Sequence, residues 1–430
     1  MAQKSKKQVE RDEQIYQLTT LVAGAFSPQE VLDRLAEAAV KITGVKACSI
    51  RLLDEQTGDL KMRSTYGLSG QYRSKGVVSK NDTVVEAAFA GEAVVLDDMR
   101  VDGRVKYRQA TIKEGLVSQL TVAMKFRDKA IGVLRLYSPR PKPFYEDDIN
   151  LARAVASQCA VAITNAKFYA NAIEAAHMAE QMRLAGIIQR RMIPDKAPVV
   201  PGLDIAATYI PCFDVGGDLY DFIKVTDSCI VAVVADVIGK GVPAAMMMSM
   251  FRGAVRAYFD TKMDKNDLQK IIKKLNTMAC QECRDGEFIT LFCAAIDTKD
   301  MSLTYCNCGH EPTALLRNGQ VTDLSKGGLV LGIDTQAEYE TKTIQLTDGD
   351  CLLFYTDGLI DAISFSDQLW GRQRLLKAAQ EFTKGSAEQM VKNVLAYRRR
   401  FVGLAEQIDD TSIIVVKINR PASLESDQSH

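Results

Sequence analysis

The sequence has little histidine and no excess of charge of either sign. Among its 430 residues there are three histidines, and 54 lysines and arginines balance 54 aspartates and glutamates. A balanced chain has no bulk basic field to attract polyanions, so the composition does not indicate a nucleic-acid partner. The length predicts two or three domains with ample hydrophobic core.

Long apolar runs are also missing. The longest are short or interrupted, as Asp236 interrupts residues 230–238, and the Lys-rich start lacks the apolar core of a signal peptide. Many of the ten cysteines, such as Cys159 and Cys293, lie inside apolar patterns, which is typical of buried thiols in a reducing compartment. We therefore expect a cytoplasmic protein without a membrane span.

Two aspartates stand at equal distances from the middle of a short polar break at residues 226–228. The runs that start at Asp218 and end at Asp236 are rich in β-branched and aromatic residues, which predicts a β-hairpin. If its loop is centred on Asp227, the two aspartates are cross-strand partners with Cβ atoms about 4.5–5.5 Å apart, where like charges are destabilising. A divalent cation between them would reverse that sign, so the hairpin is predicted to carry metal.

Further acidic residues stand at the ends of two later strand-like runs. Asp357 follows the apolar run 351–355, and Asp409 and Asp410 precede the run 412–418. Taken singly, an aspartate at a strand end is most simply a turn or cap residue. Together with the hairpin pair they form an all-oxygen set, which suits Mg²⁺ or Mn²⁺ better than zinc or copper.

Five ordered motifs carry a resemblance to a known family. They are Val-Gly-Gly-Asp-Leu-Tyr-Asp (215–221), Ala-Asp-Val-Ile-Gly-Lys-Gly-Val-Pro-Ala-Ala (235–245), Asn-Cys-Gly-His-Glu-Pro (307–312), Tyr-Thr-Asp-Gly-Leu-Ile-Asp-Ala (355–362) and Asp-Asp-Thr-Ser-Ile-Ile-Val-Val (409–416). From about residue 185 to 419 the chain resembles the SpoIIE/RsbU branch of the metal-dependent protein Ser/Thr phosphatases, the PPM family. The resemblance implies a β-sandwich flanked by helices, with two Mn²⁺ or Mg²⁺ ions at one edge.

The resemblance also implies roles for individual residues. Asp218 and Asp236 would bridge the two ions, Val237 would offer its backbone carbonyl, and Asp357 and Asp409 would complete the protein ligands. A metal-bound water would then attack phosphoserine or phosphothreonine without a protein nucleophile. The position after Asp409 is asparagine in animal relatives, so Asp410 ranks behind Asp409 as a ligand.

The sequence departs from the family pattern without losing a ligand. Cys308, Glu311 and Ile238 replace the usual alanine, asparagine and serine. No arginine occurs between residues 192 and 251, so the phosphate-clamping arginine of animal relatives is missing and the metals or the partner must position the substrate. His310 could protonate the leaving oxygen, but a structural role in the Gly-His turn is favoured.

Two classes of function follow. The first is an enzyme that dephosphorylates a protein, which the family context suggests is a STAS-domain anti-sigma-factor antagonist in bacterial partner switching. The second is a metal-free pseudophosphatase that acts as a binding module, and the filled ligand positions favour the enzyme. A zinc site at Cys280-x-x-Cys283 with Cys306-x-Cys308 is a weaker alternative, because this spacing matches no strong zinc template.

The N-terminal part predicts a separate α+β domain. A capping box, Ser27-Pro-Gln-Glu30, opens an amphipathic helix to about residue 43. Strands are predicted at 47–54, 60–66, 93–96, 118–126 and 129–137, with a short helix at 82–91 and a long helix from Glu146. The order of elements from about residue 14 to 168 resembles a GAF domain.

The sequence does not identify a ligand of the GAF-like domain. It holds no histidine, which argues against histidine-ligated haem, and Cys48 in a strand is expected to pack rather than to anchor a bilin. The cyclic-nucleotide constellation of GAF relatives is not found. A charged loop at 97–104 near the expected pocket mouth is interpreted as solvated. The domain could equally be a dimerisation scaffold.

A helical linker, 169–194, is expected to join this domain to the phosphatase domain, 195–419. Residues 146–193 contain no proline and only one glycine, Gly186. Apolar residues recur at helical spacing and predict a parallel two-helix contact in a homodimer; they are Met178, Met182, Ala185, Ile188 and Met192. The polar tail 420–430 is expected to be disordered.

Overall fold

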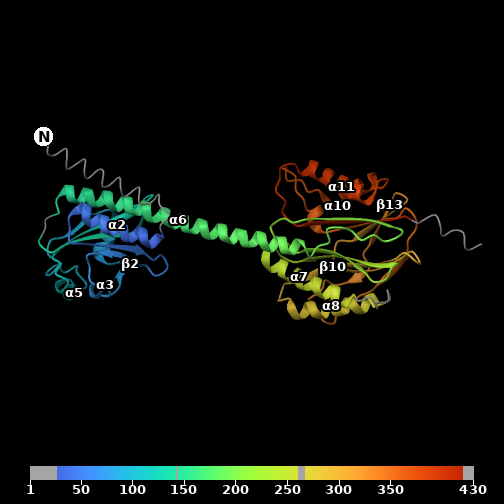
Figure 1. The fold of residues 1–430 in the computed structure, drawn as a ribbon, viewed down its shortest axis with the longest axis horizontal. Helices are drawn as coiled ribbons and strands as arrows, with labels where there is room; N and C mark the ends of the chain where they lie inside the picture. Colours follow the sequence, from blue (N-terminus) through green and yellow to red (C-terminus); the bar gives the residue numbers. More distant parts are fainter. Residues whose placement is uncertain (1–26, 142–143, 260–266, 420–430) are drawn as a thin grey trace, which may run out of the picture. The chain divides into compact units, whose positions relative to one another are not determined.

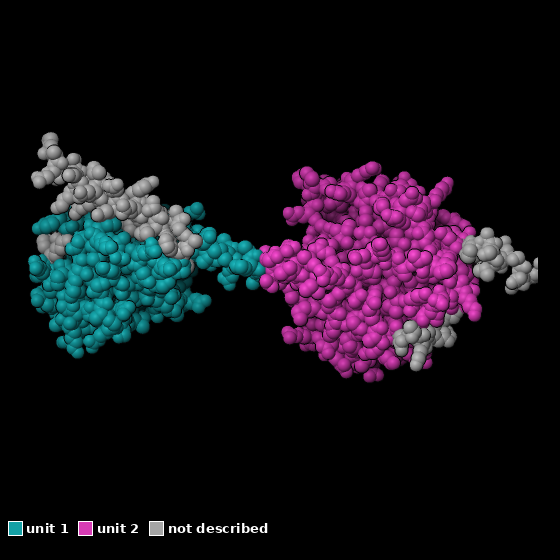
Figure 2. Space-filling model, in the orientation of Figure 1, with its two compact units in different colours: residues 1–178 teal, residues 179–430 magenta. Residues whose placement is uncertain are grey.

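The computed structural model describes residues 27–141, 144–259 and 267–419 (Figure 1). By their internal contacts the residues divide into two compact units, 1–178 and 179–430 (Figure 2). The tail 420–430 and the start of the predicted domain at 14–26 lie outside the described residues. None of the helices in the described ranges is both long enough and apolar enough to cross a membrane.

The first unit is built on one antiparallel sheet with the strand order β3-β2-β1-β6-β5-β4. Its strands are β1 (Ala47–Leu53), β2 (Asp59–Tyr66), β3 (Val78–Ser79), β4 (Val94–Leu96), β5 (Ser118–Phe126) and β6 (Lys129–Ser138). Its helices are α2 (Pro28–Thr43), α3 (Gly70–Arg73), α4 (Thr83–Ala90), α5 (Arg108–Lys113) and the first part of α6 (Glu146–Arg190). The predicted helices and strands are present, while α3, α5 and β3 were not predicted from the sequence.

Each face of this sheet is covered by different helices. The predicted capping box starts α2, where the Ser27 side chain accepts from the Glu30 amide. Helices α2 and α6 bury their apolar sides against one face, as Leu35 and Val155 pack with Ile50 and Leu134. Helices α3 and α4 cover the opposite face.

The second unit is a sandwich of two sheets. One sheet has the order β14-β11-β10-β9-β8, with β15 paired to β11, and the other has the order β13-β12-β16-β17-β7. The strands of the first sheet are β8 (Asp218–Lys224), β9 (Cys229–Val237), β10 (Ile289–Asp297), β11 (Ser302–Cys308), β14 (Gly327–Gly328) and β15 (Lys342–Gln345). Those of the second are β7 (Leu203–Ile210), β12 (Thr313–Arg317), β13 (Gln320–Leu324), β16 (Cys351–Tyr355) and β17 (Thr411–Ile418).

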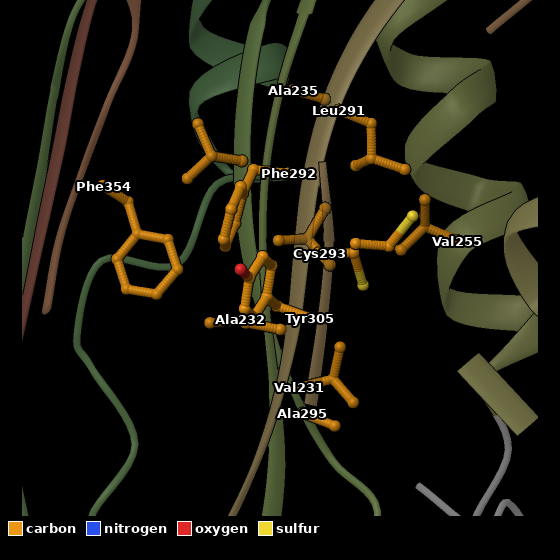
Figure 3. Close-up of a cluster of buried hydrophobic side chains, with 14 of the residues drawn as sticks. Val231, Ala232, Ala235, Val255, Leu291, Phe292, Cys293, Ala295, Tyr305 and Phe354 are labelled. Atoms are coloured by element: carbon orange, nitrogen blue, oxygen red, sulfur yellow. The ribbon is translucent and has the colours of Figure 1, made fainter. Parts of the chain in front are cut away.

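Aromatic side chains join the two sheets in the core. Phe292 of β10 stacks on Tyr305 with ring centroids 5.6 Å apart and meets Phe354 of β16 edge-on at 5.5 Å (Figure 3). The outer faces are covered by helices, with α7 and α8 on the first sheet and α10 and α11 on the second (Figure 1). These helices, with the short α9, are α7 (Gly241–Tyr258), α8 (Leu268–Glu282), α9 (Asp357–Ile360), α10 (Gly371–Glu381) and α11 (Ala387–Val402). The predicted fold class is therefore confirmed for both units.

The long helix α6 ends slightly earlier than the sequence indicated. Its last residue is Arg190, and Met192 lies in the following turn, where its amide donates to the Gln189 carbonyl at 2.9 Å. Met192 therefore does not belong to the predicted helical seam. Met178 and Ile188 do lie on the helix, with 65% and 58% of their surfaces exposed.

Candidate metal centre

The hairpin of β8 and β9 brings two aspartates face to face. In the antiparallel register Asp218 lies directly opposite Asp236, as the symmetric placement about Asp227 predicted. Asp218 is 1% exposed and opens β8, and Asp236 lies one residue before the end of β9. Two carboxylates are thus held side by side at one end of a strand pair.

Asp218 receives two hydroxyl groups from the opposite sheet. Its Oδ2 accepts from Thr356 Oγ1 at 2.6 Å and from Ser412 Oγ at 2.8 Å. Thr356 directly follows β16, and Ser412 lies in β17. Neither hydroxyl was predicted from the sequence, although both residues adjoin the predicted acidic positions. The bonds fix the orientation of Asp218 across the sandwich.

The carboxylates of the site raise one another's pKa. Burial raises the pKa of Asp218 well above its ordinary value, and the charge of Asp236 adds to this effect. Burial, followed by the charges of Asp357, Asp409 and Asp410, raises the pKa of Asp236 to about 7. The acidic positions that are far apart in the sequence therefore lie within electrostatic reach of one another.

Asp409 is held by a lysine that the sequence did not single out. Lys240 Nζ lies 2.8 Å from Asp409 Oδ2 and also donates to the Ile408 carbonyl. Lys240 belongs to the Gly-Lys-Gly segment that follows β9. Residues 192–251 contain no arginine, and in this segment Lys240 is the cation next to the carboxylate of Asp409.

Asp410 has a different task from Asp409. Its Oδ1 accepts from the Cys212 amide and its Oδ2 from the Gly217 amide, both at 2.8 Å. A Cβ at Gly216 would lie 1.9 Å from Asp410 Oδ2, so the loop can approach this carboxylate only with glycine there. Asp410 therefore holds the loop that leads into Asp218.

The residues of the site suit a hard divalent cation in their chemistry. The carboxylates supply oxygen only, and the mutual repulsion of Asp218 and Asp236 is what a cation would relieve. A Cβ at Gly217 would lie 2.7 Å from the Val237 carbonyl oxygen, so this glycine keeps space beside that oxygen. In the described ranges no three His, Cys, Asp or Glu side chains are already gathered closely enough to hold an ion, and Lys240 engages Asp409 instead.

The C-terminal end of α6 is bonded to the same loop. Gln189 Nε2 donates to the Gly216 carbonyl at 2.7 Å, and the Gly216 amide donates to Gln189 Oε1 at 2.9 Å. A Cβ at Gly186 would lie 2.1 Å from the Asp214 carbonyl oxygen, so α6 packs tightly on the loop. The sequence gave no sign of this side-chain bond, because Gln189 in a helix is usually exposed.

His310 is a buried, neutral residue. Its Nδ1 lies 2.8 Å from Thr290 Oγ1, and its Nε2 lies 3.1 Å from the Tyr355 carbonyl oxygen. Burial lowers its pKa to about 4. Because Nε2 faces a carbonyl, the ring proton resides there and Nδ1 accepts from Thr290. Both ring nitrogens are thus used inside the protein.

Comparison with known families agrees with this architecture. The family described as "Stage II sporulation protein E (SpoIIE)" matches residues 226–419, and the family described as "GAF domain" matches residues 26–164. Residues 26–164 therefore match the GAF family and residues 226–419 the SpoIIE family, so both resemblances drawn from the sequence are confirmed.

Individual relatives cover part of the chain. "Phosphoserine phosphatase RsbU" of Bacillus subtilis is 33% identical over 216 residues, which are 50% of this chain and 63% of RsbU. "Protein IcfG" of Synechocystis is 28% identical over 260 residues, covering 54% of this chain and 40% of IcfG. The chain therefore spans less than two thirds of the length of either relative.

A solved structure shows the same fold. The "SiaA-PP2C domain" of Pseudomonas aeruginosa matches with a TM-score of 0.52 at 18% identity, over 57% of this chain and 99% of that domain. The second unit thus has the PP2C-type sandwich that the sequence resemblance implied.

Proposed function

We propose that the protein is a Mn²⁺- or Mg²⁺-dependent phosphatase that hydrolyses phosphoserine or phosphothreonine on a protein substrate. The observation that carries this proposal is the pair of the buried Asp218 and the half-buried Asp236, opposed in one hairpin and surrounded by further carboxylates. Asp218 and Asp236 would hold two ions between them, with Val237 offering its carbonyl and Asp357 and Asp409 completing the set. Two bound cations supply a water nucleophile at neutral pH and positive charge for the phosphoryl oxygens.

The chain's own residues arrange the site for this chemistry. Thr356 and Ser412 fix the rotamer of Asp218, and Asp410 holds the preceding loop. Lys240 forms an ion pair with Asp409, and this ion pair must break before Asp409 can bind an ion. Lys240 therefore competes with the metal for Asp409. Once released, the lysine ammonium is the positive group of this loop that can attract a phosphorylated segment.

His310 takes a structural part in the proposal. Its ring is buried and neutral, and both nitrogens are engaged by Thr290 and Tyr355. A general acid must reach the leaving oxygen with a proton to donate. We therefore assign His310 to holding β10 against the end of β16 rather than to proton transfer.

The proposed substrate is a phosphorylated STAS-domain anti-sigma-factor antagonist. The support is the similarity to RsbU, which is described as a phosphoserine phosphatase. The competing proposal, a metal-free pseudophosphatase that only binds its partner, is less well supported because the acidic positions Asp218, Asp236, Asp357 and Asp409 are all filled. The two proposals differ in turnover, which an assay on a phosphorylated STAS protein measures.

We also propose a homodimer in which α6 carries regulation from the GAF domain to the catalytic loop. Met178 and Ile188 expose apolar surface on this helix, as a helix-helix contact between subunits requires. In the last turn of the same helix, Gln189 is bonded to Gly216, two residues before Asp218. A rotation of α6 would therefore act directly on the loop that precedes the first aspartate.

A matched pair of variants tests the phosphatase assignment. Asp236→Asn removes one of the opposed charges, whereas Asp227→Asn changes a fully exposed aspartate at the tip of the same hairpin. Mn²⁺-dependent hydrolysis of p-nitrophenyl phosphate should be lost in Asp236→Asn and kept in Asp227→Asn. In EDTA, Asp236→Asn should be more stable than wild type by about 1 kcal/mol, because the cross-strand repulsion is removed. Wild-type activity in Asp236→Asn would overturn the assignment.

A further inference from the structure

One buried face of the sheet in the first unit carries polar side chains. Along β6, Leu134 and Leu136 pack under α2 and α6, so Arg135 between them points to the opposite face. In β1, Arg51 lies on that same opposite face, beyond Ile50. Arg51 is 2% exposed and Arg135 is 7% exposed. Two guanidinium groups are thus buried on the side covered by α3 and α4.

The arginines on this face are incompletely hydrogen-bonded. Arg51 Nη1 donates to the Leu60 carbonyl at 3.2 Å, while its Nε and Nη2 have no partner. Arg135 Nε is also without a partner. Among the residues that the structure describes, no ion pair joins either arginine to a carboxylate. A buried cation without a counter-charge is costly, so an anion on this face would be strongly favoured.

A third basic side chain reaches the same place. Lys75 Nζ lies 3.5 Å from the ring centroid of Tyr72, and burial together with the charges of Arg135 and Arg51 lowers the pKa of Lys75 to about 6. While the face holds no anion, Lys75 is therefore mostly neutral at pH 7, and Arg51 and Arg135 repel one another. An anion among them would stabilise all three in their charged forms.

A cavity of about 40 Å³ lies beside these groups, with Lys75, Gln119 and Arg135 in its wall. Since one water needs roughly 10–15 Å³ by this measure, the space suits a group of a few heavy atoms. Asp82 is the carboxylate of the wall, and its Oδ2 accepts from the Ser79 amide at 3.3 Å. Arg104 also lines the cavity but is paired with Asp102 at 2.7 Å.

This arrangement revises the interpretation of the charged loop at 97–104. The loop was interpreted as solvated, and its Arg100–Asp98 pair is indeed partly exposed. Arg104, however, contributes to the cavity wall. Tyr107, just after the loop, covers the cavity by donating to the Val77 carbonyl at 2.8 Å, and a Cβ at Gly76 would lie 2.4 Å from the Tyr107 oxygen. The loop thus forms one side of a basic site.

We propose that this cavity binds a small anion bearing a carboxylate or phosphate group, held by Arg135 and Lys75 with Arg51 supplying further positive charge. The volume of about 40 Å³ matches the anionic group of a small metabolite. The proposal stands apart from the phosphatase activity, since all its residues belong to the first unit.

Isothermal titration calorimetry on the full-length protein tests the proposal. Sodium phosphate and sodium succinate are titrated separately in EDTA at constant ionic strength, with sodium chloride as the reference. EDTA keeps the second unit free of divalent metal, which could itself bind phosphate. Arg135→Gln and Lys75→Met remove charges of the site, and Arg63→Gln is the matched control, an exposed arginine on β2 of the same unit.

We expect saturable binding of at least one anion to wild type and to Arg63→Gln. Affinity should fall roughly tenfold or more in Arg135→Gln and Lys75→Met, because a charge-assisted hydrogen bond is lost. Binding of phosphate alone or of succinate alone assigns the class of ligand. Without anion, the first unit of Arg135→Gln should unfold at a higher temperature than wild type, since repulsion between Arg135 and Arg51 is relieved.

The opposite results would overturn the proposal. It is wrong if neither anion binds wild type more strongly than chloride does, or if all three variants bind as wild type does, which would place the anion elsewhere. If Arg135→Gln does not fold, as judged by circular dichroism, Lys75→Met decides between the outcomes, because the Lys75 side chain is partly exposed and its replacement disturbs the packing less.

Discussion

Gln189 and Gly216 exchange two hydrogen bonds, so the last turn of α6 is tied to the backbone of the loop that leads into Asp218. Gln189 is 5% exposed, and its amide satisfies both the donor and the acceptor of the glycine. No rearrangement of α6 that moves Gln189 can leave this loop unaffected without breaking buried hydrogen bonds.

Replacing Gln189 should therefore impair activity through the loop. Gln189→Ala leaves the amide and carbonyl of Gly216 unpaired, each at a cost of about 1–3 kcal/mol if they stay buried. We expect a higher Mn²⁺ concentration for half-maximal activity and a lower maximal rate, both measured with p-nitrophenyl phosphate. Gln181→Ala, at an exposed position of the same helix, is the control and should behave as wild type. A Gln189→Ala enzyme with an unchanged Mn²⁺ requirement would contradict the role assigned to this bond.

Insertions into α6 test whether the helix transmits rotation. Adding one to four residues near Ala175 turns the two ends of the helix by about 100° per residue relative to one another. Activity and Mn²⁺ requirement should vary with the length of the insertion in a helical pattern, with partial recovery near four residues. If every insertion length gives the same activity, the GAF domain is only a tether.

The neighbouring residues Asp409 and Asp410 should respond differently to the same substitution. Asp409→Asn weakens a proposed metal ligand, so activity should fall and recover in part at high Mn²⁺ concentration. Asp410→Asn keeps one acceptor oxygen for the two loop amides and loses the other, so it should lower the unfolding temperature yet retain more activity than Asp409→Asn. Thermal unfolding and Mn²⁺ titrations of both variants check this. Equal recovery by Mn²⁺ in the two variants would show that both residues are ligands.

His310 should make stability depend on pH. Its pKa is about 4 in the folded protein against an ordinary value of 6.5, so the unfolded chain binds more protons between these values. Its contribution is therefore present above pH 6.5 and is lost as pH falls toward 4, by about 3 kcal/mol in full. Denaturant unfolding at a series of pH values should show this loss in wild type and in His177→Gln, an exposed control, but a smaller loss in His310→Gln. Parallel curves for the three proteins would refute the buried neutral state.

The register of the β8–β9 hairpin was predictable because it depends only on residues that are close together in the sequence. Two strand-like runs about a short polar break allow one symmetric pairing, and the structure has it. The capping box of α2 is local in the same way, since Ser27 and Glu30 are three residues apart. In these places the sequence determines the structure within a few residues, whatever the rest of the chain does.

The bonds that complete the sites were not predictable, because they depend on how separate elements dock. Thr356 and Ser412 reach Asp218 only when the second sheet packs on the first. Arg51 and Arg135 lie in strands whose side chains alternate between the two faces of the sheet. They are buried only because α3 and α4 cover the face on which they lie. A polar residue in a strand usually faces solvent, so the basic cavity could be recognised only after both faces were known to be covered.

Strand β17 has a consequence for the synthesis of the protein. It pairs with both β16 and β7, it contains Ser412, and it directly follows Asp409 and Asp410. The sandwich and the acidic site are thus completed by the same late segment of the chain. During translation, when domains fold as they emerge, β7 and the hairpin must wait for residues 409–418 to leave the ribosome. A nascent chain can therefore acquire its GAF domain long before it can assemble the acidic site.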